Sequence, residues 1–520
     1  MPNRRHKGNL SRRFFLQMGA ASAGIFLMDA SRPAPLRAAT PKRGGTFTLG
    51  GVGGVAEFSP FMINPGHTPF MRAIWNSLGR YDDNLKLQPD LAEEWDFSSD
   101  GKTLTLKLRQ GVKWHSGREF TSDDVKYSVN YGQTSDRSLL KALYLSIKSV
   151  GTPDKYTAIF NFDTVNPGAF DILDTLYMVD KETFGQRANT AVGTGPFKLD
   201  KFVPNDHMEL VSFKDYWEGA PYLDRYIIRQ IPDAPALAVS LESGAVDCIY
   251  NPAYVDTVRL QGAGDKWTIN PGAVGTAMYD VGMNTQMAPF DNKKVRQAIA
   301  HAIDRDRFCK IVLRGLSGPT TLMWPNYSWA YQKDLDGTNG YNLDKAAALL
   351  KEAGFEKGFN TELLAATRQL PGTGALAEIL QADLKKLNIN ATINDLEIAQ
   401  YNARTQTKRD MSMMTHFYGR TARDPGSMLT GAKAWYTDKE GGWTRFASPQ
   451  YEQLRKDLQS TLDRNKRIQI CRQIQLLMLD ECPTIPVAPL PQVFIYANYV
   501  KGFANDRDNS IYVGKMWLDR

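Results

Sequence analysis

Residues 91–125 read LAEEWDFSSDGKTLTLKLRQGVKWHSGREFTSDDV, and this stretch is the most informative about the fold. Apolar and polar residues alternate over 95–97 and over 104–108, which is typical of two strands that each bury one face. The sequence SDGK at 99–102 predicts a hairpin turn between them. The TSDD at 121–124 has the spacing of a capping box, which predicts that a helix begins there. The stretch is therefore expected to form strand, turn, strand and helix.

The rest of the chain continues this mixture of strands and helices. We expect strands at 46–49, 355–366 and 389–396, and helices at 375–388 and 448–480. Further helices are expected after three capping residues, Asp291, Asp304 and Asn342, and the last of these helices should stop at Gly354. No repeat of 20 to 50 residues is visible, which argues against a solenoid or a propeller. These patterns predict an α/β protein.

The basic charge of the chain is concentrated at its start. The 520 residues carry a formal net charge of +7, but residues 1–39 hold seven basic residues and one acid, which leaves 56 basic against 55 acidic residues beyond them. A remainder so nearly neutral argues against a nucleic-acid partner. Arg12-Arg13-Phe14-Phe15-Leu16 opens a short apolar run and resembles a twin-arginine export signal. We therefore expect 1–39 to be a signal peptide, with no direct membrane span, and the mature chain to be periplasmic.

Export places the cysteines in an oxidising compartment. Cys248, Cys309, Cys471 and Cys482 form no CxxC motif, and neither they nor the six histidines have zinc-ligand spacing. The sequence leaves open four free thiols, one bridge with two free thiols, or two bridges. No metal and no cofactor are expected.

Catalytic and phosphate-binding motifs are also not evident. Gly193-Thr194-Gly195-Pro196 has neither the lysine of a Walker loop nor the third glycine of a dinucleotide loop, so it is interpreted as a tight turn. His115 lies between an expected strand and a turn, which favours a hydrogen-bonded structural histidine. No Gly-x-Ser-x-Gly elbow is present. The sequence therefore predicts no catalytic residues.

Several short motifs, in this order and spacing, resemble one family. They include residues 91–95, 100–103, 108–117, 120–125, 193–197, 289–291, 295–299, 302–305 and Asp424-Pro425. Together they resemble the extracellular solute-binding proteins of dipeptide, oligopeptide and nickel ABC importers, family 5, over essentially the whole mature chain. The resemblance implies a two-lobed α/β binding fold with a hinge and with an extra subdomain in the first lobe.

The resemblance also implies a division of the chain. The core of the first lobe would comprise 40–85, 195–283 and 488–520, and its extra subdomain would comprise 86–194. The second lobe would comprise 284–487. The partners implied are a small-molecule solute, two permease subunits and, through them, a pair of ATPase subunits. The protein is expected to act as a monomer and not as an enzyme.

Peptide-binding members of the family use an acid near the Asp-Pro segment for the ligand's amino group and an arginine elsewhere for its carboxylate. Aligning these motifs places the arginine at Arg368 and the acid at Thr421, which Arg420 and Arg423 flank. Because Thr421 is not an acid, the family pattern predicts a solute that is anionic or lacks a free α-amino group, such as an opine-like conjugate or a modified peptide. Arg368 and Arg420 could each bind a carboxylate through two hydrogen bonds.

Four aromatic side chains are expected to form walls of the same pocket: Phe417, Tyr418, Tyr144 and Trp435. Against this interpretation, either arginine could instead pair with Asp424 or another structural acid. His416 could contact a metal chelate, but a single histidine more often forms a local hydrogen bond. Two other functions stay open: an exported hydrolase, and a chemosensory or chaperone-type binding protein on the same fold.

Overall fold

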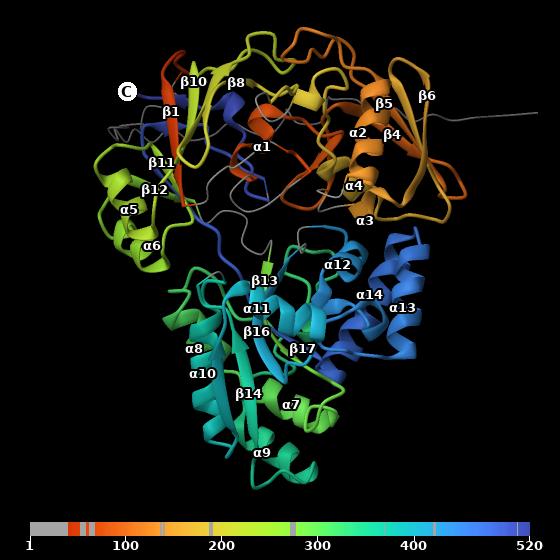
Figure 1. The fold of residues 1–520 in the computed structure, drawn as a ribbon, viewed down its shortest axis with the longest axis vertical. Helices are drawn as coiled ribbons and strands as arrows, with labels where there is room; N and C mark the ends of the chain where they lie inside the picture. The colour runs from red at the N-terminus through yellow and green to blue at the C-terminus, as the bar shows by residue number, and fades with distance from the viewer. Residues whose placement is uncertain are drawn as a thin grey trace, which may run out of the picture. The chain divides into compact units, whose positions relative to one another are not determined.

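The computed structural model describes residues 40–52, 59–61, 68–135, 138, 141–186, 191–270, 277–368, 370–419, 423–506 and 508–520. Strands and helices alternate along the chain, as expected for an α/β protein, and form three main sheets (Figure 1). The predicted signal peptide, residues 1–39, lies outside the described residues. Within the described ranges, no helix is long and apolar enough to cross a membrane.

The largest sheet has seven strands in the order β12-β18-β11-β1-β10-β9-β8. Its central strand β1 runs parallel to both neighbours, whereas the outer strands pair antiparallel. Its core includes Phe47, Phe197 and Tyr226. The strands are β1 (Thr46–Gly51), β8 (Phe197–Val203), β9 (His207–Ser212), β10 (Arg225–Gln230), β11 (Cys248–Tyr250), β12 (Trp267–Asn270) and β18 (Phe494–Ala497). Helices α1 (Thr68–Ile74), α5 (Ala234–Glu242) and α6 (Tyr254–Gln261) accompany this sheet.

A four-stranded antiparallel sheet contains the hairpin predicted from residues 91–125. Strands β4 (Ala92–Phe97) and β5 (Thr103–Leu108) pair across the expected turn, and Leu104, Leu106 and Leu108 are buried. Thr121 and Asp124 form the predicted capping box at the start of α2 (Ser122–Thr134). The sheet is completed by β6 (Ile147–Asp154) and β7 (Thr157–Phe162), and α3 (Lys141–Tyr144) and α4 (Ala169–Thr175) belong to the same region.

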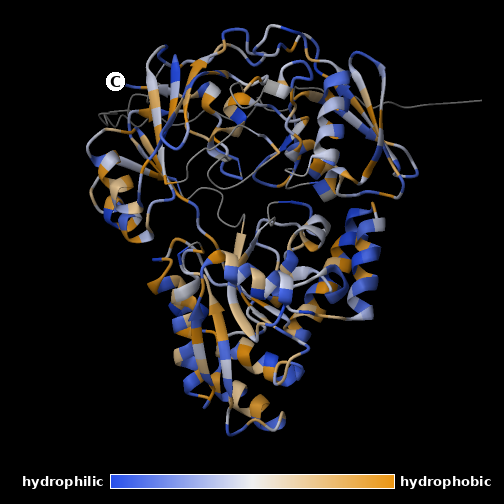
Figure 2. Ribbon diagram, in the orientation of Figure 1, coloured by the Kyte–Doolittle hydropathy of each residue, from blue (hydrophilic) through white to orange (hydrophobic). Residues whose placement is uncertain are grey.

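A five-stranded sheet in the order β15-β14-β16-β13-β17 forms the centre of the second lobe. Helices with apolar and polar sides surround it, as Figure 2 shows for α7, α9 and α10. The strands are β13 (Ala277–Met283), β14 (Asn360–Ala365), β15 (Asn390–Asp395), β16 (Met413–Gly419) and β17 (Thr484–Pro489). The helices are α7 (Lys293–Ala302), α8 (Arg305–Ile311), α9 (Leu343–Glu352), α10 (Thr373–Lys385), α11 (Ile398–Asn402), α12 (Pro425–Gly431), α13 (Pro449–Ser460) and α14 (Arg464–Glu481).

Short elements complete the described chain. They are strands β2 (Gly79–Tyr81), β3 (Leu87–Pro89), β19 (Val500–Lys501) and β20 (Trp517–Leu518), the 3-10 helices η1 (Phe184–Gln186), η2 (Lys333–Leu335), η4 (Lys433–Trp435), η5 (Asp438–Glu440) and η6 (Val513–Lys515), and the π-helix η3 (Ala403–Lys408).

Three sequence expectations need correction. Strand β13 pairs with β16 and β17 in the five-stranded sheet of the second lobe, whereas the predicted boundary after residue 283 assigned this strand to the first lobe. The helix expected after Asp291 is capped by Asn292, whose side chain accepts a hydrogen bond from the Lys294 amide. The helix expected at 448–480 is two helices, because Asp463 caps a new helix, α14. The other lobe boundaries remain predictions.

The strand expected at 355–366 is shorter, because β14 begins at Asn360, whereas other local predictions agree with the structure. Asp304 and Asn342 cap α8 and α9, and Gly354 follows the end of α9 with a φ of +82°. Gly193 and Gly195 pack against the backbone of Ile74, whose oxygen would lie 1.8 Å from a Cβ at position 193. The turn therefore needs glycine because two backbone segments approach closely. All four cysteines are buried and unpaired, so of the three open possibilities the structure has the free thiols.

Candidate functional site

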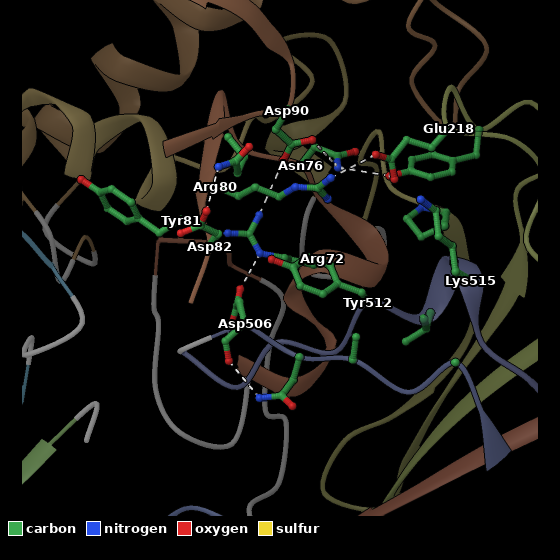
Figure 3. A pocket seen from close by; sticks show the side chains of 18 of the residues that line it. Arg72, Asn76, Arg80, Tyr81, Asp82, Asp90, Glu218, Asp506, Tyr512 and Lys515 are labelled. Atoms are coloured by element: carbon green, nitrogen blue, oxygen red, sulfur yellow. Dashed lines mark hydrogen bonds and ion pairs between the residues drawn. The ribbon is translucent and has the colours of Figure 1, made fainter. Parts of the chain in front are cut away.

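A cavity of about 450 Å³ lies among residues of α1, β2, β3 and residues 502–515, which we call the C-terminal segment (Figure 3). Acids outnumber bases among the charged residues that line it, with Asp82, Asp83, Asp90, Glu218 and Asp506 against Arg72, Arg80 and Lys515. In Figure 3 the guanidinium of Arg72 lies between Asp90 and Asp506. The size suits a small molecule.

Arg72 is the centre of a buried charge network on α1. Its side chain is 5% exposed and donates to Asp506 at 2.6 Å, to Asp174 at 2.9 Å and to Ser77 at 3.1 Å. Asp90 lies 3.5 Å away, and burial raises the pKa of its carboxyl to about 6 although Arg72 and Arg80 oppose the shift. Arg72 therefore joins α1 to α4 and to the C-terminal segment through ionic hydrogen bonds.

Arg423 extends this network to the second lobe. It follows β16 and contacts Asp508 in the C-terminal segment and Asp174 in α4, the latter at 3.1 Å. The next residue, Asp424, donates its backbone N–H to the carboxylate of Asp171 at 3.1 Å. Burial and the charge of Asp424 raise the pKa of Asp171. The segment after β16 thus binds α4 and the C-terminal segment, both of which lie outside the lobe that holds the five-stranded sheet.

The carboxylate of Asp424 is occupied within its own lobe. Arg467 on α14 donates to both of its oxygens, at 2.7 and 2.5 Å, and the Gly426 amide donates to one of them at 2.8 Å. The two side chains are 10% and 7% exposed, and Arg467 also lies over the ring of Trp329. Asp424 is consequently a structural acid that fixes the start of α12.

The sequence predictions for the site have different outcomes. Arg368 follows β14 and is 79% exposed, with one ion pair to the exposed Glu397 at 3.6 Å. Arg423, the other arginine that flanks position 421, is 12% exposed and bound to Asp174 and Asp508. Arg420 and Thr421 lie outside the described residues.

Three of the four predicted aromatic walls are core residues in this structure. Tyr144 is fully buried and donates to the Thr175 carbonyl at 3.2 Å, within the core of the four-stranded sheet. Tyr418 is 1% exposed, donates to the Met323 carbonyl at 2.8 Å and packs edge-on against Trp435, which is itself 2% exposed. Their structural role is packing. Phe417 is half-buried and lies edge-on to Tyr279.

Both histidines named from the sequence have structural surroundings. His115 accepts from the Gly193 amide at 3.2 Å and lies 2.9 Å from the Gly195 carbonyl, and burial lowers its pKa to about 4. This agrees with the prediction of a hydrogen-bonded histidine. His416 packs on Tyr401 and Trp443, and burial lowers its pKa to about 3. Among the described residues, no group of three or more His, Cys, Asp or Glu is placed to hold a metal ion.

Sequence reasoning missed the network itself. Arg72 and Asp506 are 434 positions apart, and Asp171 and Asp424 are 253 apart. Acids and arginines at such separations form no motif, so no signal in the sequence could have selected them. Only the folded chain brings α1, α4, the segment after β16 and the C-terminal segment together.

Comparisons with known proteins agree with this architecture. A family model, "Bacterial extracellular solute-binding proteins, family 5 Middle", matches residues 86–442. The chain is 29% identical over 490 residues to the dipeptide-binding protein of Escherichia coli strain K12, covering 86% of this chain and 90% of that protein. It is 30% identical over 412 residues to a putative ABC transporter peptide-binding protein of Brucella ovis, covering 75% and 76%.

A solved structure shares the fold. The PBP AgaA from A. tumefacien R10, in complex with agropinic acid, superposes with a TM-score of 0.75 at 25% identity, covering 92% of this chain and 99% of that one. The family model spans more than half of the chain, and the relatives are similar over most of their length. The chain therefore belongs to family 5 of the bacterial extracellular solute-binding proteins.

Proposed function

We propose that this chain is the solute-binding component of an ABC importer, which captures a small solute between its two lobes and delivers it to a membrane permease. The observation that carries this proposal is the position of Arg423. It ties the segment after β16 to Asp174 and Asp508, so that closing the lobes forms a buried ionic contact directly beside positions 420–422. Such a contact can contribute to hinge closure around a bound solute. The peptide-binding relatives support an importer role.

The solute that this site would favour is anionic or lacks a free α-amino group. Asp424 is the acid nearest to Thr421 in the sequence, and Arg467 occupies both of its carboxylate oxygens. A solute ammonium beside it would have to compete with that bidentate pair. Arg368, by contrast, is largely exposed and has one loose partner, so it can exchange Glu397 for a solute carboxylate. The AgaA structure supports an opine-like solute, because that protein holds agropinic acid.

The remaining parts of the proposal concern export and partners. The mature protein is exported by the twin-arginine route, acts in the periplasm as a monomer, and has no catalytic role. Its partners are the permease and, through it, the ATPase subunits. Support for the export route comes from the sequence around Arg12-Arg13.

The test compares matched ligands by isothermal titration calorimetry. A carboxylated opine and an N-acetylated dipeptide are expected to bind more tightly than the same dipeptide with a free amino group. Arg368→Gln should weaken binding of each carboxylate by at least tenfold. Arg259→Gln is the control, since this exposed arginine on α6 pairs with Glu242 and Asp256. Equal affinity of the Arg368→Gln variant and the unchanged protein would contradict the role of Arg368.

A second variant tests the absent acid directly. Thr421→Asp restores the acid that peptide-binding members place there, and it should shift the preference toward the dipeptide with a free amino group. The reason is that a buried ammonium without a partner costs several kcal/mol, which a carboxylate offsets. If the unchanged protein already prefers free dipeptides and Thr421→Asp leaves that preference as it is, the solute class proposed here is wrong. The importer role would stand in that case.

A further inference from the structure

Arg305 is a buried cation that has no carboxylate partner among the residues that the structure describes. The residue is 4% exposed and begins α8. Its guanidinium donates to backbone carbonyls, from Nε to Pro486 at 2.9 Å and from Nη1 to Asn339 at 3.0 Å and Ala300 at 3.2 Å. The second terminal nitrogen, Nη2, is buried and has no hydrogen-bond partner in the described part of the chain. Carbonyl oxygens satisfy some of its N–H groups but supply no negative charge.

Acids influence Arg305 only weakly, because Asp336 and Asp306 favour its charge but do not outweigh the effect of burial. No Asp or Glu of the described ranges forms an ion pair with it, and burial lowers the pKa of its guanidinium to about 10. The Asp336 carboxylate accepts hydrogen bonds from Thr321 and Tyr331 and forms no ion pair with Arg305 in the described ranges. Buried arginines elsewhere in this lobe do have acids: Arg296 is bound to Glu481 at 2.8 Å. A buried charge without a counter-charge is costly, so a counter-ion is expected.

A small cavity adjoins Arg305. Its volume is about 10 Å³, which suits a single water-sized species. Trp435 also lines it, and the indole Nε1 of this 2% exposed residue is a second buried donor without a partner. Gln475 lines the cavity as well and uses its side-chain oxygen to accept from the Met323 amide. No acid is among the lining residues. The wall therefore offers donors and a positive charge to whatever occupies it.

We propose that this cavity is a binding site for one small monovalent anion of the size of chloride, held by Arg305 and Trp435. A water molecule would accept the two hydrogen bonds but leave the charge of Arg305 uncompensated, whereas a halide does both. Sulfate and phosphate are too large for a space of about 10 Å³. The site joins α8, η4, α14 and β17, so the anion would hold these elements of the second lobe together. It is separate from the residues proposed to bind the solute carboxylate.

The first experiment measures thermal unfolding of the mature protein in sodium chloride and in sodium gluconate at equal ionic strength. We expect the midpoint to rise with chloride and to saturate, as binding to the folded state requires. Bromide should act in the same way, and crystals grown or soaked in bromide should give an anomalous peak beside Arg305 Nη2 and Trp435 Nε1. Identical midpoints in chloride and gluconate, together with no bromide peak, would mean that the cavity holds water and would overturn the proposal.

Variants separate the site from a general effect of salt. Arg305→Met should abolish the difference between chloride and gluconate. Arg296→Met is the matched control: it removes an equally buried arginine that already has a carboxylate, so the chloride dependence should persist whatever happens to overall stability. If Arg305→Met does not fold, Trp435→Phe removes one donor and keeps the charge, and it should shift half-saturation to at least severalfold higher chloride. An unchanged half-saturation in that variant would contradict the assigned position.

Discussion

Removing one partner of the ion pair between Asp424 and Arg467 is predicted to destabilise the second lobe strongly. The pair is bidentate, at 2.7 and 2.5 Å, and its side chains are 10% and 7% exposed. Asp424→Asn keeps the size of the side chain and an oxygen for the Gly426 amide, but leaves the charge of Arg467 buried beside Trp329. Removing one partner of such a pair costs about 3–5 kcal/mol. For a unit that spans Pro41–Arg520, this corresponds to a fall in Tm of roughly 3–5 °C.

A double-mutant cycle distinguishes this pair from a simple loss of packing. Chemical denaturation should be measured for Asp424→Asn, Arg467→Met and the double variant. The double variant removes both charges, so it should be more stable than the sum of the single changes implies, with a coupling of at least about 2 kcal/mol. Asp163→Asn, which breaks an exposed pair with Lys148, should leave the midpoint unchanged. A cost below about 1 kcal/mol for Asp424→Asn, or additive single changes, would refute the reasoning.

Three further predictions concern stability and are checked by denaturation curves. Burial raises the pKa of Asp280, so above about pH 4 the unfolded chain releases a proton that the folded chain keeps, and stability falls as the pH rises. Asp280→Asn should therefore raise the free energy of unfolding at pH 7 but not at pH 4. An equal effect at both pH values would contradict this. Gly193→Ala would place a Cβ 1.8 Å from a carbonyl oxygen and should cost about 2–4 kcal/mol, whereas Gly318→Ala, in open space, should change stability by less than about 0.5 kcal/mol. Tyr418→Phe should cost about 1–2 kcal/mol by leaving the Met323 carbonyl unpaired, with solute affinity unchanged; weaker binding would make Tyr418 a pocket wall.

Much of the fold could be predicted because its signals are local. The hairpin of β4 and β5 follows from alternation around a turn, and the capping residues Thr121, Asp304 and Asn342 mark helix starts within one or two turns of sequence. The errors have the same origin. Asp291 and Asn292 are adjacent and both can cap a helix, so only the folded backbone decides between them. The position of β13 depends on pairing with β16 and β17, far along the chain.

The candidate site was less predictable, because the sequence does not distinguish an aromatic side chain that lines a pocket from one that packs in the core below the pocket. Tyr418 and Phe417 are neighbours on β16, and their side chains point to opposite faces of the sheet. Tyr418 packs with Trp435 in one core, whereas Phe417 lies edge-on to Tyr279. The position of β16 between its two neighbouring strands would have to be known to see that Phe417 can be partly exposed and Tyr418 cannot.

The charges that flank positions 420–422 have a consequence for specificity. On one side, Gly419 pairs with Ala277 in the sheet; on the other, Arg423 and Asp424 are committed to ion pairs with α4, the C-terminal segment and α14. The conformation on both sides is therefore fixed by residues that need not contact the solute. Under the proposed function, substitutions at 420–422 would change the charge that the solute meets, while Arg423 and Asp424 keep their own ion pairs. The solute class proposed above therefore predicts that the residue at position 421 differs between family members that bind ligands with a free amino group and members that bind ligands without one.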